Sequence, residues 1–64
     1  MNGLTPLQRA SRYGYIEMCA FLIKHGADVD LKNNNGATAL FIASVHGHYD
    51  VCDLLIKHGA SVDI

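Results

Sequence analysis

Apolar positions recur at helical spacing along this chain, and polar residues separate them. The clearest stripe is made by Ile16, Cys19, Phe21, Leu22 and Ile23. Apolar residues spaced three and four apart are typical of a helix with one buried face. We therefore expect helices over residues 6–13, 16–25, 39–46 and 49–58, each too short to be stable without packing against another.

Local signals mark the ends of the first predicted helix. The Thr5 hydroxyl can cap a free backbone N–H, Pro6 has no N–H to lose, and Gln8 can complete a capping box. Gly14 suits the left-handed residue that ends a helix. Leu7 and Ala10 should face inward from this helix.

The whole pattern returns after 33 residues: residues 22–27 read Leu-Ile-Lys-His-Gly-Ala, and so do residues 55–60. At the same offset Thr5 matches Thr38, Gly14 matches Gly47, and about half of all comparable positions are identical. A fixed offset of this size is typical of stacked repeat proteins. Neither helix pair can bury its apolar faces alone, so we expect one pair to stack on the next.

The segment Gly3-Leu4-Thr5-Pro6-Leu7-Gln8-Arg9-Ala10, followed by Gly14 and by residues 22–30, resembles an ankyrin repeat, and residues 36–63 match equally well. The resemblance implies an all-α ankyrin-repeat solenoid. Its two helix-turn-helix units, residues 1–33 and 34–64, would be joined by a β-hairpin-like loop and would form part of a longer array. Five positions depart from the family pattern. Ala39 stands where Pro is usual, and Asp30 and Asp63 stand where Asn is common. Gln8 and Phe41 stand where His usually joins neighbouring repeats, and only Gln8 can partly replace it.

Composition narrows the possible functions. Half of the 64 residues are apolar, and the few charges, net −1, are interspersed along the sequence. This gives no electrostatic reason to expect nucleic acid or a membrane as a partner. No apolar run approaches the ~20 residues of a membrane span, and the first residues do not have the basic-then-apolar layout that is expected of a signal peptide. We expect an intracellular, cytoplasmic protein, with the nucleus as an alternative.

Histidine and cysteine are the candidate metal ligands. His46 and His48 are close in sequence, and Cys19 and Cys52 are equivalent in the two units, but no Cys-x-x-Cys motif is present to build a tetrahedral site. Equivalent helices should lie about 8–10 Å apart, which exceeds the ~7 Å that a disulfide spans between Cα atoms. We expect no metal, no disulfide and no cofactor, and both thiols should pack as small apolar groups.

An enzyme is not expected either. Each glycine fits a turn or a helix end, so no phosphate-binding loop is apparent. The acidic residues Asp28, Asp30 and Asp63 belong to the segments that leave the second helices, where turn and solvent roles suffice. A chain of this length also leaves little room for a deep pocket.

Protein recognition remains as the predicted function. In the ankyrin family, partners bind a concave face made of loop tips and first helices. The candidates are residues at which the two units differ or the loop is free to vary: Leu4, Arg12, Tyr13, Lys32, Asn34, Ala37, Val45 and His46. The partner would be a protein, and self-association or adjacent repeats are further possibilities. The alternative is a structural spacer within a larger protein.

Overall fold

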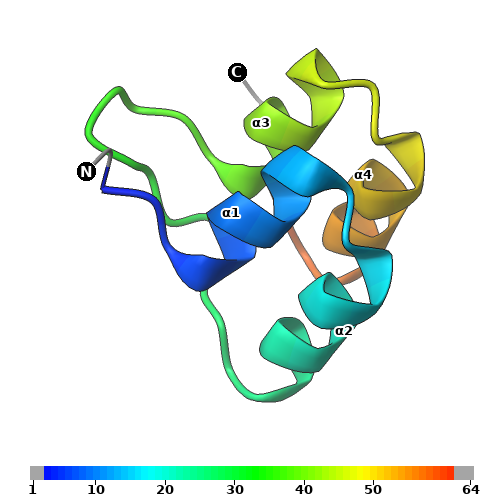
Figure 1. Ribbon diagram of the computed structural model, residues 1–64. Coiled ribbons are helices and arrows are strands. Elements are labelled where there is room, and N and C mark those ends of the chain that lie inside the picture. Colours follow the sequence, from blue (N-terminus) through cyan, green and yellow to red (C-terminus); the bar gives the residue numbers. More distant parts are fainter. Residues whose placement is uncertain (1–2, 62–64) are drawn as a thin grey trace.

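The computed structural model describes residues 3–61, and four helices account for their regular structure (Figure 1). They are α1 (Pro6–Tyr13), α2 (Ile16–Lys24), α3 (Ala39–Val45) and α4 (Tyr49–Lys57). The predicted bounds of α1 are confirmed, and the other three helices end one residue earlier than predicted. Helices α1 and α2 form one hairpin, and α3 and α4 form the other. The two hairpins stack with α1 against α3 and α2 against α4.

The predicted capping box opens α1. The backbone N–H of Gln8 donates to Thr5 Oγ1 at 3.1 Å, and the backbone N–H of Thr5 donates to the side-chain Oε1 of Gln8 at 3.0 Å. Gly14 ends the helix with φ of 74°, the left-handed conformation that a residue without Cβ adopts most easily. In α3, Thr38 Oγ1 accepts from the Phe41 amide at 3.2 Å. Phe41 has no acceptor to return the bond, so only half of the box forms there.

The core lies between the two hairpins and draws on all four helices. It consists of small and aliphatic side chains that pack tightly: Leu7, Ala10, Cys19, Ala39, Leu40, Ala43, Val51, Leu55 and Ala60. The inward orientation predicted for Leu7 and Ala10 is confirmed. Stacking of the two units is therefore the source of the hydrophobic stabilisation, as their sequence pattern indicates.

Equivalent residues of the two units differ in burial because each unit is covered on one side only. Val51 is fully buried, whereas its counterpart Met18 is 49% exposed. Leu55 is buried and Leu22 is half-buried. The prediction that Phe21 belongs to the buried stripe is wrong. Its side chain is 57% exposed and lies against the His25 ring, 4.4 Å between ring centroids.

A tight loop joins the two units. The Asn33 amide donates to the Ala37 carbonyl at 2.9 Å, and Asn33 Oδ1 accepts from the amides of Asn35 and Ala37. Gly36 has a φ of 79°, which lets the chain reverse here. The loop thus resembles a β-hairpin, although residues 31–38 contain no assigned strand.

Among residues 3–61, no helix combines the length and the apolar character needed to cross a lipid bilayer.

Candidate functional site

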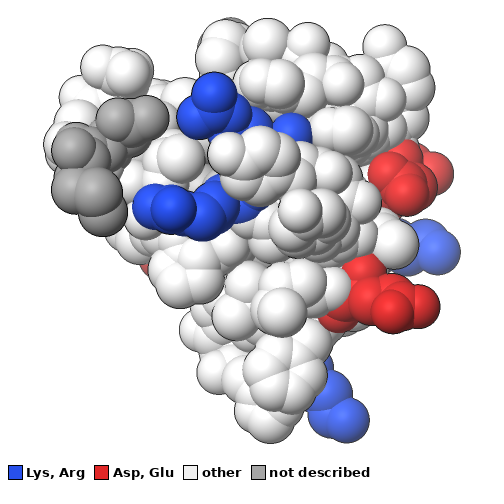
Figure 2. Space-filling model, viewed as in Figure 1, with Lys and Arg blue, Asp and Glu red and all other residues white. Residues whose placement is uncertain are grey.

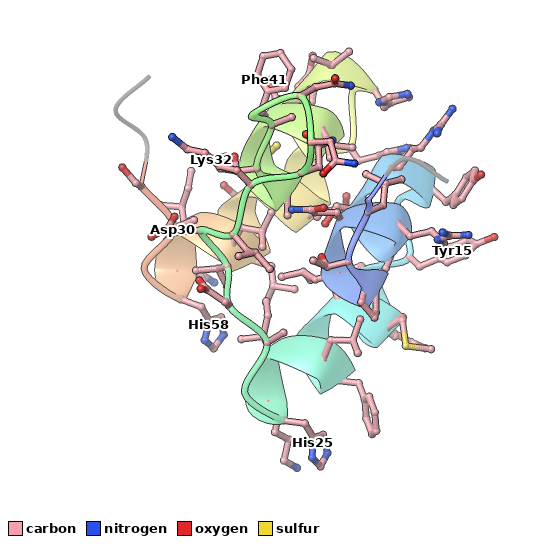
Figure 3. The ribbon with its side chains drawn as sticks, turned by 90° about the vertical axis from the view of Figure 1, so that its left-hand side faces the viewer. Tyr15, His25, Asp30, Lys32, Phe41 and His58 are labelled. Carbon is pink, nitrogen blue, oxygen red and sulfur yellow. The ribbon has the colours of Figure 1, made fainter. Side chains whose placement is uncertain are left out.

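Six residues at or just beyond the C-terminal ends of α1 and α3 form a group that we call the ring cluster, in which all but the half-buried His48 are exposed: Arg12, Tyr13, Tyr15, Val45, His46 and His48. In its first half, the Arg12 guanidinium lies 5.8 Å from the centroid of the Tyr13 ring. That ring lies 5.7 Å from the ring of Tyr15, and both tyrosines are more than half exposed. Figure 3 shows Tyr15 pointing outward from the helices.

The second half of the ring cluster repeats this arrangement with imidazoles. His46 and His48 lie nearly parallel, with 6.4 Å between ring centroids. His48 Nε2 lies 3.0 Å from the Arg12 carbonyl oxygen, so Nε2 must carry the proton and donate it. This bond connects residues 36 apart in sequence and holds the two halves together. Val45, at the end of α3, is an apolar residue with a 63% exposed side chain.

The other predicted site residues lie at the opposite ends of α1 and α3. We call them the loop group: Leu4, Lys32, Asn34 and Ala37. Asn34 is exposed and its side chain lies against Gly3. Leu4 and Ala37 are half-buried, and Lys32 is exposed. One helix of eight residues separates this loop group from the ring cluster, which corresponds to about 12 Å. The structure therefore divides the predicted residues into two groups on the side of α1 and α3.

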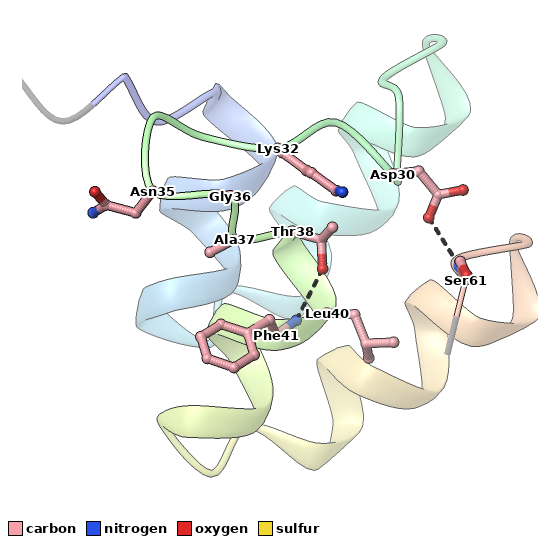
Figure 4. A pocket seen from close by; sticks show the side chains of 9 residues that line it. All are labelled: Asp30, Lys32, Asn35, Gly36, Ala37, Thr38, Leu40, Phe41 and Ser61. Carbon is pink, nitrogen blue, oxygen red and sulfur yellow. Dashed lines mark hydrogen bonds between the residues drawn. The ribbon is translucent and has the colours of Figure 1, made fainter. Parts of the chain in front are cut away.

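An open hollow of about 520 Å³ lies on the α3 side of the loop (Figure 4). Its walls include Lys32, Ala37 and Phe41. The hollow is open, so it does not contradict the expectation of no deep pocket, and two of its polar residues already have structural roles. The Thr38 hydroxyl caps α3, and Asp30 Oδ1 accepts from the Ser61 amide at 2.8 Å.

Comparison with known proteins gives the family. The model described as "Ankyrin repeats (3 copies)" matches residues 1–64. This chain belongs to the ankyrin repeat family. A solved chain that it resembles comes from the complex of the Bd0816 predatory endopeptidase of Bdellovibrio bacteriovorus with the immunity protein Bd3460. The TM-score is 0.94 and the identity 44%, over 98% of this chain and 33% of that chain. This ankyrin chain thus spans about a third of the length of the chain it matches.

Gln8 occupies the position at which ankyrin repeats usually have histidine. Its side chain is 1% exposed, and Nε2 donates to the Leu31 carbonyl at 2.6 Å. This bond joins α1 to the start of the loop that leads into the next unit, while the replacement of the usual histidine by Gln8 stays a prediction. Phe41, its counterpart, is 47% exposed and points into the hollow instead.

The two cysteines of this ankyrin pair are free thiols. Burial raises the pKa of Cys19 above its ordinary value; the Ser11 hydroxyl, 3.7 Å from Sγ, partly opposes this, and the Asp50 charge adds to it. Burial also raises the pKa of Cys52, with the charges of Asp53 and Asp50 acting in the same direction. Both thiols are therefore poor nucleophiles. Residues 3–61 bring together no three histidine, cysteine or acidic side chains that could hold a metal ion.

Sequence reasoning missed three exposed aromatic residues. Tyr15 and Tyr49 are 60% and 71% exposed, and Phe41 lines the hollow. The sequence contained a signal for Tyr15 as a candidate. Tyr15 follows a helix-ending glycine, and the equivalent residue of the other ankyrin unit is different, His48. Nothing in the sequence distinguishes Tyr49, at the start of a helix, from a core residue.

Proposed function

We propose that this chain is a non-catalytic protein-recognition module, and that a partner protein binds the face made by the ring cluster and the loop group. The family gives the general role, since stacked repeats present an extended concave surface to partners. The similar chain from Bdellovibrio comes from a complex between a peptidase and an immunity protein. That complex supports a protein, rather than another class of molecule, as the partner of this chain. The identity of the partner is not inferred from it.

The ring cluster is the observation on which the proposal rests. Arginine and tyrosine are enriched among residues that dominate binding energy. Arg12 and Tyr13 are exposed and in contact with each other, and Val45 and His46, at the equivalent positions of the next unit, are exposed as well. Tyrosine also loses little conformational entropy on binding, because two torsion angles define its side chain. The loop group extends the same surface, with Lys32 and Asn34 exposed and Leu4 and Ala37 shaping the loop.

The open ends of the stack favour a second candidate function. Met18 at one end and Phe41 at the other are about half exposed, whereas the equivalent residues Val51 and Gln8 are buried between the units. Further repeats stacked on these ends would bury both. In that case residues 1–33 and 34–64 would be two units of a longer array, and the segment would act as a spacer.

A capture experiment distinguishes the two functions. The full chain and an Arg12→Ala/Tyr13→Ala/Val45→Ala/His46→Ser variant are each used to capture partners from a lysate of the source cells. A matched control replaces four exposed residues of the other helices, Glu17, Lys24, Asp53 and Lys57, with alanine. Circular dichroism checks that all three are folded. Loss of a partner in the ring-cluster variant alone supports recognition. Equal capture by all three refutes the ring cluster as the binding face, and capture of no partner by any of them refutes recognition and leaves the spacer.

A further inference from the structure

Charges that are interspersed along the sequence become separated in the fold. The segments α1, α3 and residues 31–38 contain three positive charges and no negative one, whereas α2, α4 and the segment 27–30 contain five acids and two lysines. The first set is Arg9, Arg12 and Lys32, and the second is Glu17, Asp28, Asp30, Asp50, Asp53, Lys24 and Lys57. Figure 2 shows basic side chains over α1 and acidic ones beside α2 and α4. A net charge of −1 conceals this polarity.

The two arginines of α1 have no carboxylate within their own helix, whereas Lys32 shares the lining of the hollow with Asp30. No aspartate or glutamate occurs between Gly3 and Ile16 or between Leu31 and His48. Two of the nearest acids in sequence already accept hydrogen bonds. Asp28 Oδ1 accepts from the Asp30 amide at 2.9 Å, and Asp30 Oδ1 accepts from the Ser61 amide.

Two of the positive charges are placed to act together. Arg9 and Arg12 are both exposed and lie three residues apart on α1, so they share one face of the helix. Each guanidinium can bind a carboxylate through two parallel hydrogen bonds. The Tyr13 ring, in contact with Arg12, offers an apolar surface next to these donors. The matching partner surface would have carboxylates beside an apolar side chain.

From this arrangement we infer that the face formed by α1, α3 and the loop binds an acidic protein surface. The inference rests on the proposed function and specifies the chemistry of the partner. Electrostatic complementarity steers association and excludes wrong partners. A nucleic acid fits less well, because it carries one charge per ~1.7 Å of helix and typical complexes neutralise about 6–10 phosphates. Three cations cannot neutralise that many phosphates, and the acidic residues of α2 and α4 would repel the phosphate backbone of the nucleic acid.

The test uses charged polymers as probes. Poly-L-glutamate, poly-L-lysine of equal length and a duplex DNA are each titrated into the isotope-labelled full chain, and amide shifts are followed by NMR. The variant is Arg9→Gln/Arg12→Gln. The matched control, Lys24→Gln/Lys57→Gln, removes the same charge from α2 and α4. All four residues are exposed, so both variants should stay folded.

We expect poly-L-glutamate to shift amides of α1, α3 and the loop, and the Arg9/Arg12 variant to weaken its binding at least about fivefold, whereas the control leaves it unchanged. Added salt should weaken binding of the unmodified chain. Equal weakening in both variants, or no binding of poly-L-glutamate, overturns the inference. Tighter binding of the DNA through the same amides overturns it in favour of a nucleic acid.

The outcome is separable from that of the proposed function. If the partner captured through the ring cluster is held equally by the Arg9/Arg12 variant, recognition stands and the acidic partner is refuted. If no partner depends on the ring cluster, the proposed function fails whatever the polymer titrations give.

Discussion

The imidazole of His48 fills the space that Gly14 leaves by having no side chain. A Cβ atom built on Gly14 would lie 2.6 Å from His48 Nδ1, closer than real contacts allow. From this position His48 Nε2 reaches the Arg12 carbonyl oxygen at 3.0 Å. Gly14 therefore has two roles: it ends α1 in the left-handed conformation, and it admits the ring that connects the two units.

Substitution at Gly14 should cost more than left-handed strain alone. Gly47 has nearly the same φ, 76° against 74°, but nothing lies within 4 Å of the site where its Cβ would be. Gly47→Ala should lose about 1–2 kcal/mol of unfolding free energy, the cost of a left-handed L-residue. Gly14→Ala should lose at least about 1 kcal/mol more, because the ring must move. Urea denaturation measures both, and equal losses would contradict the packing described.

Gln8 should contribute to stability through its two hydrogen bonds. Gln8→Met keeps the size of the side chain but leaves the Leu31 carbonyl and the Thr5 amide without this partner. We expect a loss of about 2–4 kcal/mol, since each such group costs about 1–3 kcal/mol when buried and unpaired. Phe41→Met, at the equivalent half-exposed position, is the control and should change stability by under ~1 kcal/mol. A similar small effect at both positions would show that the Gln8 bonds carry little energy.

The helices were predictable because their signals are local. Thr5, Pro6 and Gln8 define a helix start within four residues, and Gly14 defines an end. The repeat offset then transfers these bounds to the second unit. The prediction that failed concerned which side chains of a helix are buried. Five apolar residues between 16 and 23 indicate a wide stripe, but only packing of α2 against its neighbours decides that Phe21 lies outside it.

The candidate site was less predictable, because position in the stack matters as much as residue type. Leu22 and Leu55 are the same residue in the same local sequence, yet one is half-buried and the other buried. The bond from His48 to Arg12 spans 36 residues and has no signature in the chain. Charge separation was missed for the same reason, since it appears only when the helices are placed side by side.

The difference between Leu22 and Leu55 leads to another prediction. Leu55→Ala should lose about 2–5 kcal/mol, because a fully buried leucine leaves a cavity. Leu22→Ala should lose roughly half as much, because part of its side chain already faces solvent and the site can relax. Thermal or urea unfolding followed by circular dichroism distinguishes the two. Equal losses would mean that another surface covers Leu22 in solution, as a stacked repeat or a second copy of the chain would.

The thiols of Cys19, which is buried, and Cys52, which is half-buried, should make the protein less stable in alkali. Burial raises the pKa of both Cys19 and Cys52 in the folded chain, so the unfolded chain releases its thiol protons at a lower pH. The unfolded state is then favoured as pH rises past the ordinary thiol value of 9.0, and unfolding free energy should fall from there upward. Below that pH both states keep their thiol protons, and this contribution is constant.

A Cys19→Ala/Cys52→Ala variant isolates this effect from the other groups that titrate in alkali. Tyrosines and lysines also release protons in this range, but they are common to both proteins. Urea midpoints measured from about pH 7 to about pH 10.5 should therefore decline more steeply for the unmodified chain than for the variant. The comparison uses slopes, because the small cavity left at Cys19 lowers the stability of the variant at every pH. Parallel slopes would show that the thiolates are as well solvated in the fold as in the unfolded chain, against the burial seen around Cys19.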